Sequence, residues 1–275
     1  MELLLLGTSA AEGWPAPVCD CEGCTAARRL GGKNVRSRSG ALIDDDLKID
    51  FSPDTVSQLQ RLGRSLRSVR TILFTHEHSD HLDAAELHWF LPPYTVTPLK
   101  HTLHLYGNEG VLNEIRRWIA KELGTAVELH LMRELETITT IDGDRVLPLP
   151  AEHSPGALML RITRSNARGG KTILYGHDSG PYPAATLDAL SDGVKLDIAL
   201  FDCTYGLEEH PRSHMGVKGV SRMAEELRRR GAITDRTRCI ATHFSHNGKA
   251  LHDDLVRVLA PHRIEPAYDG MVVKV

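Results

Sequence analysis

The feature that most constrains this chain is a short apolar run that ends in a cluster of metal-binding side chains. Residues 70–75 (RTILFT) are rich in apolar and β-branched side chains and are predicted to form a buried strand. The next six residues hold four side chains of the kinds that bind first-row metal ions: His76, His78, Asp80 and His81. Because histidine is uncommon and the strand leads directly into the cluster, we interpret these residues as ligands and not as a solvated loop.

The spacing within this cluster predicts two neighbouring metal positions. Side chains alternate between the two faces of a strand, so His76 and His78 point the same way and can chelate one ion. Asp80 and His81 follow in the turn, where the backbone can direct them to a point a few ångströms further on. In two-metal hydrolytic sites the ions lie about 3.5–4 Å apart.

Three further loops repeat the pattern of an apolar strand followed by a polar residue of ligand type. The apolar runs at 145–150, 171–175 and 239–242 lead to His153, Asp178 and His243, respectively. If the four loops meet at one edge of a sheet, ligands that are distant in the sequence come together there. This convergence is the main argument for a site.

A second set of ligand-type residues lies in a Pro/Gly-rich loop at about 17–27. The loop contains a Cys-x-Cys-x-x-Cys pattern formed by Cys19, Cys21 and Cys24. A structural zinc site requires four ligands in a tetrahedron, so a fourth must come from elsewhere in the chain. His243 and His246 are three residues apart and can point to different centres. We predict that His243 binds metal together with the cluster at 76–81, and that His246 is the fourth ligand of the zinc site.

The His-x-His-x-Asp-His pattern after a buried strand resembles the signature of the metallo-β-lactamase superfamily. The resemblance implies the α/β fold class, with two mixed β-sheets packed face to face in an αββα sandwich, and helices outside. We expect a single domain over residues 1–275. Ala84 departs from the usual pattern, because many members have glycine there, and this puts the local turn in question.

The resemblance also implies a role for each ligand of a dinuclear metal centre. His153 would complete the first set with His76 and His78. Asp178 would bridge both ions. The second ion would be held by Asp80, His81 and His243.

Further motifs are similar to the PhnP-like phosphodiesterase subgroup, named after an accessory protein of the carbon–phosphorus lyase pathway. They are the cysteine loop after the first strand and the Thr-His-x-Ser-His pattern at 242–246. The segment 211–214 resembles the loop that bears the catalytic histidine of the subgroup. His214 would therefore act as a general acid or stabilise charge on the leaving oxygen, with Asp80 as the second catalytic residue. His177 is a departure, since the subgroup often has serine there.

These features predict a dinuclear-metal-dependent phosphodiesterase that hydrolyses small cyclic phosphodiesters. Substrates of the 2′,3′-cyclic nucleotide or ribose 1,2-cyclic phosphate type are implied by the resemblance. The cofactors would be two divalent ions, drawn from manganese, zinc and iron, and one structural zinc ion.

Three alternatives remain open at this point. RNase Z-like processing of tRNA 3′ ends uses the same ligands, although no long RNA-gripping arm is visible in the sequence. Hydrolysis of β-lactams or thioesters is less favoured, because those branches lack the cysteine loop. A non-catalytic metal-binding scaffold or sensor is disfavoured by the intact set of seven ligands.

Composition restricts the partners and the location. The 275 residues carry a net charge of −3, which provides no strongly basic surface for long nucleic acids. The apolar run at 3–6 is too short for a signal peptide, and no apolar run approaches the roughly 20 residues that span a bilayer. We therefore expect a cytoplasmic protein without membrane contact. A homodimer is the assembly that general frequencies favour.

Periodicity predicts the following elements. Strands are expected at 2–6, 39–43, 47–50, 103–106, 127–131, 136–140, 145–150, 157–162, 171–175, 196–201 and 239–242. Helices are expected at 55–63, 83–91, 109–123, 217–230 and 249–259, and a hairpin turn at 168–170.

Overall fold

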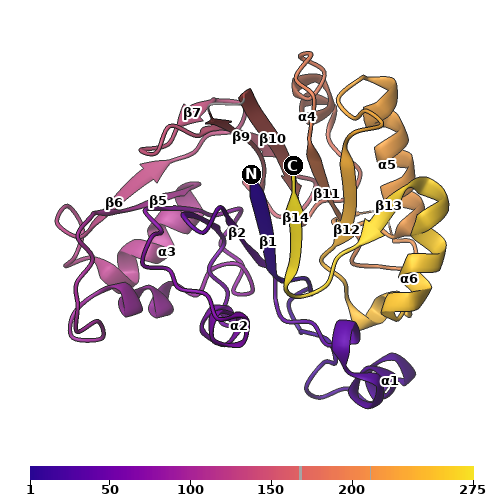
Figure 1. The fold of residues 1–275 in the computed structure, drawn as a ribbon, viewed down its shortest axis with the longest axis horizontal. Coiled ribbons are helices and arrows are strands. Elements are labelled where there is room, and N and C mark those ends of the chain that lie inside the picture. Colours follow the sequence, from indigo (N-terminus) through magenta and orange to yellow (C-terminus); the bar gives the residue numbers. More distant parts are fainter. Residues whose placement is uncertain (167–168, 211) are drawn as a thin grey trace.

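The computed structural model describes residues 1–166, 169–210 and 212–275. Within these residues, two seven-stranded β-sheets pack face to face, and helices lie on their outer sides (Figure 1). Both sheets combine parallel and antiparallel pairs. The predicted α/β sandwich of two mixed sheets is confirmed.

The elements have these bounds. The first sheet contains β1 (Glu2–Gly7), β2 (Gly40–Ile43), β3 (Leu47–Ile49), β4 (Thr71–Leu73), β5 (Leu103–Gly107), β6 (Val127–Leu131) and β14 (Met271–Lys274). The second sheet contains β7 (Ile138–Thr139), β8 (Arg145–Pro150), β9 (Leu158–Asn166), β10 (Gly169–Gly176), β11 (Ile198–Asp202), β12 (Arg238–Thr242) and β13 (Ile264–Pro266). The α-helices are α1 (Glu22–Leu30), α2 (Thr55–Leu62), α3 (Glu109–Ile119), α4 (Ala184–Ala189), α5 (Val217–Arg229) and α6 (His252–Leu259). Short 3₁₀ helices are η1 (Gly32–Asn34), η2 (Ala84–Phe90), η3 (His246–Gly248) and η4 (Ala260–His262).

Strand β1 shows why the apolar runs of this chain are continuous and do not alternate with polar residues. Leu3 and Leu5 belong to the core between the two sheets, whereas Leu4 and Leu6 belong to a second core beneath the helices. All four side chains are almost completely buried. A strand that is covered on both faces requires apolar residues at every position.

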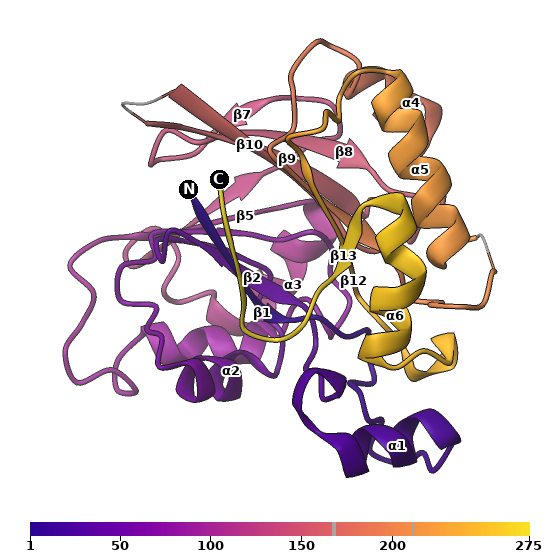
Figure 2. The same ribbon diagram turned by 45° about the vertical axis from the view of Figure 1, so that its right-hand side comes forward.

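The helices form the two outer layers. Helices α2 and α3 lie on the outer side of the first sheet, and α5 and α6 lie along the outer side of the second (Figures 1 and 2). The sequence of helix α3 provides one apolar face for packing on the sheet, because Val111, Ile115 and Ile119 recur every four residues and are all buried. Within the described ranges, no helix combines the length and the apolar character that crossing a bilayer requires.

The strand order brings the loops of the two sheets to one place. Strands β3 to β6 are parallel in the first sheet, and β10 to β13 are parallel in the second. The carboxyl ends of parallel strands lie at the same edge of a sheet. Hydrogen bonds then join the loops: the Leu158 amide donates to the Thr75 carbonyl at 3.0 Å, and the Gly180 amide donates to the Glu152 carbonyl at 3.0 Å.

Several predicted elements differ from the structure. The helix expected at 83–91 is the 3₁₀ helix η2, because the amide of Asp83 is held by the Phe51 carbonyl and only seven residues remain before Leu91 becomes extended. The last helix begins at His252, three residues later than expected, because η3 and Lys249 in a left-handed conformation precede it. The strand expected at 136–140 is only Ile138–Thr139. The predicted turn at 168–170 includes Arg168, which lies outside the described residues, although β9 and β10 pair as expected.

Candidate metal centre and active site

The loop after β4 is held in a tight turn that carries four of the predicted ligands. The amide of Thr75 donates to Oδ1 of Asp50 at 2.8 Å, which fixes the start of the loop. The amides of His81 and Leu82 both donate to the His78 carbonyl at 2.9 Å. The chain therefore reverses direction after His78. Ala84 begins η2, so no left-handed backbone that would favour glycine is present at this position.

One group of ligand atoms consists of three imidazoles from two loops. His76, His78 and His153 each offer a nitrogen, and these atoms lie within 4.8 Å of one another. Nε2 of His153 is 3.1 Å from Nδ1 of His78. Burial lowers the pKa of His76 and of His153, so both rings favour the neutral form that binds metal. This is the set predicted for the first ion.

The second group lies deeper and contains the predicted second set. The ligand atoms of Asp80, His81 and His243 lie within 4.8 Å of one another, and all three residues are buried. Burial would raise the pKa of Asp80, but the neighbouring His81 and His243 keep its carboxyl ionised.

Asp178 faces both groups. Its Oδ2 lies 3.8 Å from Nε2 of His76 and 2.5 Å from Nε2 of His81, and its Oδ1 lies 3.1 Å from Nε2 of His243. Burial would raise the pKa of Asp178, but the fields of His243 and His81 lower it well below its usual range. This position is the one expected for a carboxylate that bridges two ions.

Unpaired buried atoms test whether a metal centre fits here. Nε2 of His76, His81 and His243 and Oδ2 of Asp178 are buried and form no hydrogen bond of regular geometry among the described residues, although Nε2 of His81 and Oδ2 of Asp178 lie 2.5 Å apart. A buried polar atom without a partner is costly, and a bound cation removes that cost for donor atoms of this type. Asp178 and His243 also have positive φ angles of 46° and 61°, which are strained for these residue types and are typical of functional positions. The residues therefore fit a pair of divalent ions.

Carboxylates and hydroxyls behind the ligands orient the imidazole rings, and sequence reasoning did not identify them. Nδ1 of His81 lies 2.7 Å from Oδ2 of Asp50, which is completely buried. Nδ1 of His243 lies 2.9 Å from the hydroxyl of Thr204. Such partners fix the ring so that Nε2 points at the metal position. The available signal was position, because Asp50 directly follows β3 and Thr204 lies just beyond β11.

The structure also brings His214 to the centre. Its Nδ1 lies 2.7 Å from Oδ2 of Asp202 and 3.7 Å from Oδ1 of Asp178. Burial would lower the pKa of His214, but the charge of Asp202 outweighs this and raises it to about 9. The raised pKa favours the protonated form of this ring. Pro211, at the start of the predicted catalytic loop, lies outside the described residues.

The predicted cysteine site is assembled from the two ends of the chain. Sγ of Cys19 and Sγ of Cys21 each lie 3.5 Å from Nδ1 of His246, and Cys24 completes a set whose ligand atoms lie within 4.8 Å of one another. The hydrogen bond from His246 lowers the pKa of Cys21 to about 6, which favours the thiolate that binds zinc. Oε1 of Glu12 lies 3.5 Å from Nε2 of His246 and can orient this ring, a role that the sequence did not suggest.

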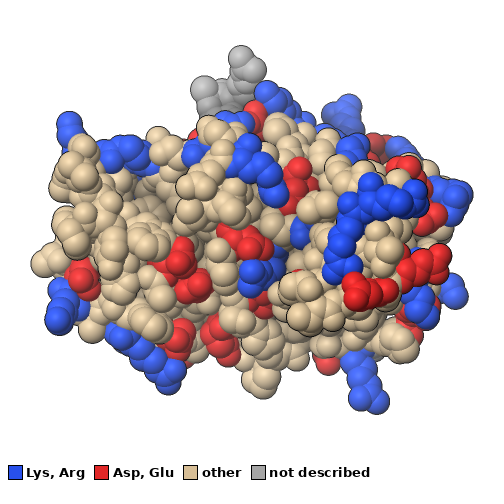
Figure 3. Space-filling model, turned by 90° about the horizontal axis from the view of Figure 1, so that it is seen from below, with Lys and Arg blue, Asp and Glu red and all other residues tan. Residues whose placement is uncertain are grey.

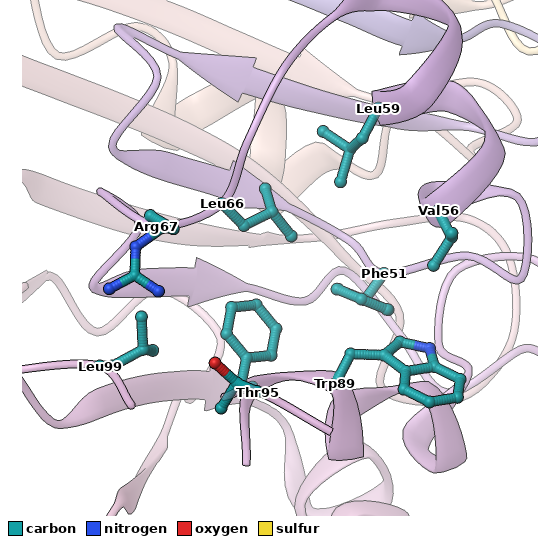
Figure 4. Close-up of a pocket in the computed structure, with 9 residues that line it drawn as sticks. Phe51, Val56, Leu59, Leu66, Arg67, Trp89, Thr95 and Leu99 are labelled. Carbon is teal, nitrogen blue, oxygen red and sulfur yellow. The ribbon is translucent and has the colours of Figure 1, made fainter. Parts of the chain in front are cut away.

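An apolar cavity of about 210 Å³ lies apart from these groups, on the α2 side of the first sheet (Figure 4). Val56 and Leu59 of α2 point into it from one side, and Trp89 of η2 points into it from the other. Arg67 is its only lining residue with a formal charge, and its guanidinium donates to the Thr97 carbonyl at 2.8 Å. The cavity contains no set of ligand or acid–base groups.

The comparisons with known proteins agree with this geometry. The sequence model of the Beta-lactamase superfamily domain matches residues 47–244. Coenzyme PQQ synthesis protein B of Cupriavidus necator is 25% identical over 315 residues, which cover 98% of each chain. A solved structure described as a new diphosphatase from the PhnP family has a TM-score of 0.74 at 25% identity and covers 100% of this chain and 97% of that one. Zinc-bound PqqB from Methylobacterium extorquens has a TM-score of 0.78 at 18% identity, with both chains covered completely.

Fold, site geometry and sequence match lead to the same conclusion. The chain belongs to the β-lactamase superfamily and is a hydrolase of the metallo-β-lactamase fold.

Proposed function

We propose that this hydrolase is a dinuclear-metal phosphodiesterase whose substrates are small cyclic phosphodiesters. The observation that carries the proposal is the pair formed by His214 and Asp202 beside the bridging residue Asp178. Cleavage of a phosphodiester releases an alkoxide, which needs a proton. A partly buried imidazolium whose pKa is raised to about 9 is suited to donate that proton.

We assign the ligands of the two ions as the superfamily resemblance implies. His76, His78 and His153 would hold one ion, the set of Asp80, His81 and His243 would hold the other, and Asp178 would contact both. When bound, two such ions supply an activated water and neutralise charge on the phosphoryl oxygens. The choice among manganese, zinc and iron stays a prediction, because sites of this donor type accept all three.

Differences in exposure favour one direction of substrate entry. Asp80, His81 and His243 are buried, whereas His78 is exposed and His153 and His214 are partly exposed. A phosphoryl group therefore reaches the centre from the side of His78, His153 and His214. His214 then lies on the same side as the departing oxygen. Its ring centroid is 4.9 Å from that of His153.

Surface charge supports a small substrate. On the face seen in Figure 3, Lys and Arg side chains lie among Asp and Glu side chains and do not form a continuous basic track. The net charge of −3 agrees with this mixture. Long nucleic acids bind mainly through many phosphate contacts to Lys and Arg, so a compact diester fits better.

A diphosphate bond is the second candidate for cleavage. The observation that favours it is the 25% identity over the full chain with a structure described as a PhnP-family diphosphatase. The same metal groups and the same proton donor would serve this reaction, because its leaving group is also an oxygen. RNase Z-like activity, the metal-binding scaffold, the cytoplasmic location and the homodimer stay predictions.

The test is the initial rate at which manganese-reconstituted protein hydrolyses a 2′,3′-cyclic nucleotide. Asp80→Ala is the paired variant, since it removes a ligand of the second set while its fold can be checked by circular dichroism. We expect turnover by the wild-type protein and loss of most of it in the variant.

Three outcomes would contradict this proposal in part or in full. Full turnover by folded Asp80→Ala would remove Asp80 from the catalytic centre. If the wild-type protein binds both metals but cleaves only a diphosphate such as a nucleoside diphosphate sugar, the second candidate replaces the first. If the wild-type protein cleaves neither substrate, and His214→Ala behaves like the wild-type protein in every assay, the metal-binding scaffold interpretation replaces both candidate functions.

A further inference from the structure

A further cluster of side chains of metal-ligand type lies on β5 and β6, outside the two sites described above. These strands are parallel, and their register pairs His104 with Glu128 and Tyr106 with His130. Residues two apart on a strand share a face, so the four side chains lie on the same side of the sheet. Tyr106 belongs to the core between the sheets, which places the cluster on the inner face of the first sheet.

Three ligand atoms converge in this cluster. Nδ1 of His104 lies 3.0 Å from Nε2 of His130 and 3.5 Å from Oε2 of Glu128. Nε2 of His130 lies 3.9 Å from the same carboxylate oxygen. With metal–ligand bonds of about 2.0–2.2 Å, donors at the corners of a tetrahedron lie roughly 3.3–3.5 Å apart. The observed triangle, with sides of 3.0, 3.5 and 3.9 Å, approximates one face of such a tetrahedron and needs only small side-chain adjustments to reach it.

The two imidazoles are held in place before any ion binds. The His130 ring stacks on the Tyr106 ring with centroids 4.3 Å apart and an angle of 15° between the planes. The Tyr106 hydroxyl in turn accepts a hydrogen bond of 3.1 Å from the Ile141 amide. His104 is only 7% exposed. A site with fixed ligands loses little conformational entropy when it binds an ion.

The cluster opens into a groove of about 610 Å³ that can admit an ion and a fourth ligand. The groove lies between the edge strands β6 and β7 of the two sheets, and Ile138 to Ile141 form its opposite wall. The side chain of Glu128 is 52% exposed, so it can adjust toward the ion. An ion held here would have a water molecule at its free position, because no fourth protein ligand is present among the described lining residues.

This position is separate from the dinuclear centre. His104 pairs with Thr71 at the beginning of β4, whereas the loop that carries the dinuclear ligands follows the end of β4. Thr71 and Thr75 are four positions apart, which corresponds to about 13 Å in extended chain.

We propose that His104, Glu128 and His130 form a third metal site, which takes a single zinc ion or a similar divalent ion that favours imidazole ligands. Two imidazoles and one carboxylate are a known donor set for zinc sites that keep one position open. The ion would link the edge strand β6 to β5. It would join His104 and His130, which are 26 residues apart in sequence. It would therefore bind the folded chain and stabilise this edge.

The test is the number of zinc ions bound by the full-length chain at equilibrium with buffered free zinc, measured by atomic emission. We expect His130→Gln to bind one equivalent fewer than the wild-type protein, or to bind that equivalent at least tenfold more weakly. His262→Gln is the matched control, since it makes the same substitution at a partly buried histidine of η4 outside the cluster. It should bind as many ions as the wild-type protein.

The same count separates this site from the other two. His130→Gln should also remove one equivalent from a chain that already carries Asp80→Ala and Cys24→Ser. If His130→Gln unfolds, Glu128→Gln replaces an exposed carboxylate and tests the same ion. Equal zinc content and equal affinity in the wild-type protein and the folded variants would overturn the proposal, and the cluster would then be a hydrogen-bonded histidine pair.

Discussion

Nδ1 of His214 lies 2.7 Å from Oδ2 of Asp202, a carboxylate that is completely buried at the end of β11. The pair resembles an orienting carboxylate and a proton donor that act as one unit. The protonation state of His214 in this pair should determine how turnover depends on pH.

The first prediction concerns this dependence. If His214 donates a proton, turnover should fall as the pH rises through its pKa of about 9. Asp202→Asn removes the charge that raises this pKa, so the fall should move toward the ordinary histidine value near 6.5. The measurement is kcat against pH, with Asp197→Asn at the other end of the same strand region as control. An unchanged profile in Asp202→Asn would exclude His214 as the titrating acid.

The same pair contributes to stability with a defined sign. The pKa of His214 is higher in the folded chain than in the unfolded one, so the stabilisation is complete below about pH 6.5 and disappears as the pH rises through about 9. The difference in free energy of unfolding between the wild-type protein and Asp202→Asn should therefore shrink across this window.

The second prediction concerns Asp50. Asp50→Asn keeps the shape of the side chain but weakens its interaction with Nδ1 of His81. Loss of an outer partner of this kind typically weakens metal affinity about 10–100-fold. Metal titration of the apoprotein should show this loss, whereas Asp45→Asn, which changes a partly exposed carboxylate in the β2–β3 turn at the other end of β3, should bind metal normally. Equal affinities for both variants would contradict the orienting role.

The third prediction concerns Gly180. A Cβ atom at this position would lie 1.9 Å from the carbonyl oxygen of Arg212, two residues before His214. Gly180→Ala must therefore displace the loop that positions the proton donor, and misplacement by about 1 Å can lower the rate about 10²-fold. The metal content should remain unchanged. Gly170→Ala, where the nearest atom is 3.5 Å away, provides the control. A normal kcat in Gly180→Ala would show that the loop position is unimportant.

The fourth prediction concerns the cysteine site. Cys21→Ser should lose the structural zinc and lower the melting temperature, because this ion joins residues 225 positions apart in the chain. Each kcal/mol of lost stability corresponds to roughly 2–4 °C for a chain of this size. The folded fraction should still turn over substrate. Cys239→Ala changes a buried cysteine of β12 that is outside the site and should retain its zinc. Unchanged zinc content in Cys21→Ser would refute the assignment.

The sequence predicted which side chains come together, because each of the loops that carry them follows an apolar strand. The pattern at 70–81 specified both a strand and a turn, and the loops at His153, Asp178 and His243 repeated it. The residues behind the ligands were not predictable in this way. Asp50 contacts His81 only because β3 and β4 are parallel neighbours in register, and an aspartate at the end of a strand has no distinctive local pattern. Glu12 meets His246 only after both ends of the chain have been brought together.

The pairing of β1 with β14 has a consequence for how this protein is made. The amino group of Met1 reaches the carbonyl of Val275, a contact between residues 274 positions apart. On the ribosome, β1 therefore emerges long before β14 and lacks this neighbour until β14 has been synthesised. During this time its four leucines and its free edge are open to wrong partners. We expect the nascent chain to depend on chaperones, and its release from them to coincide with the arrival of β14.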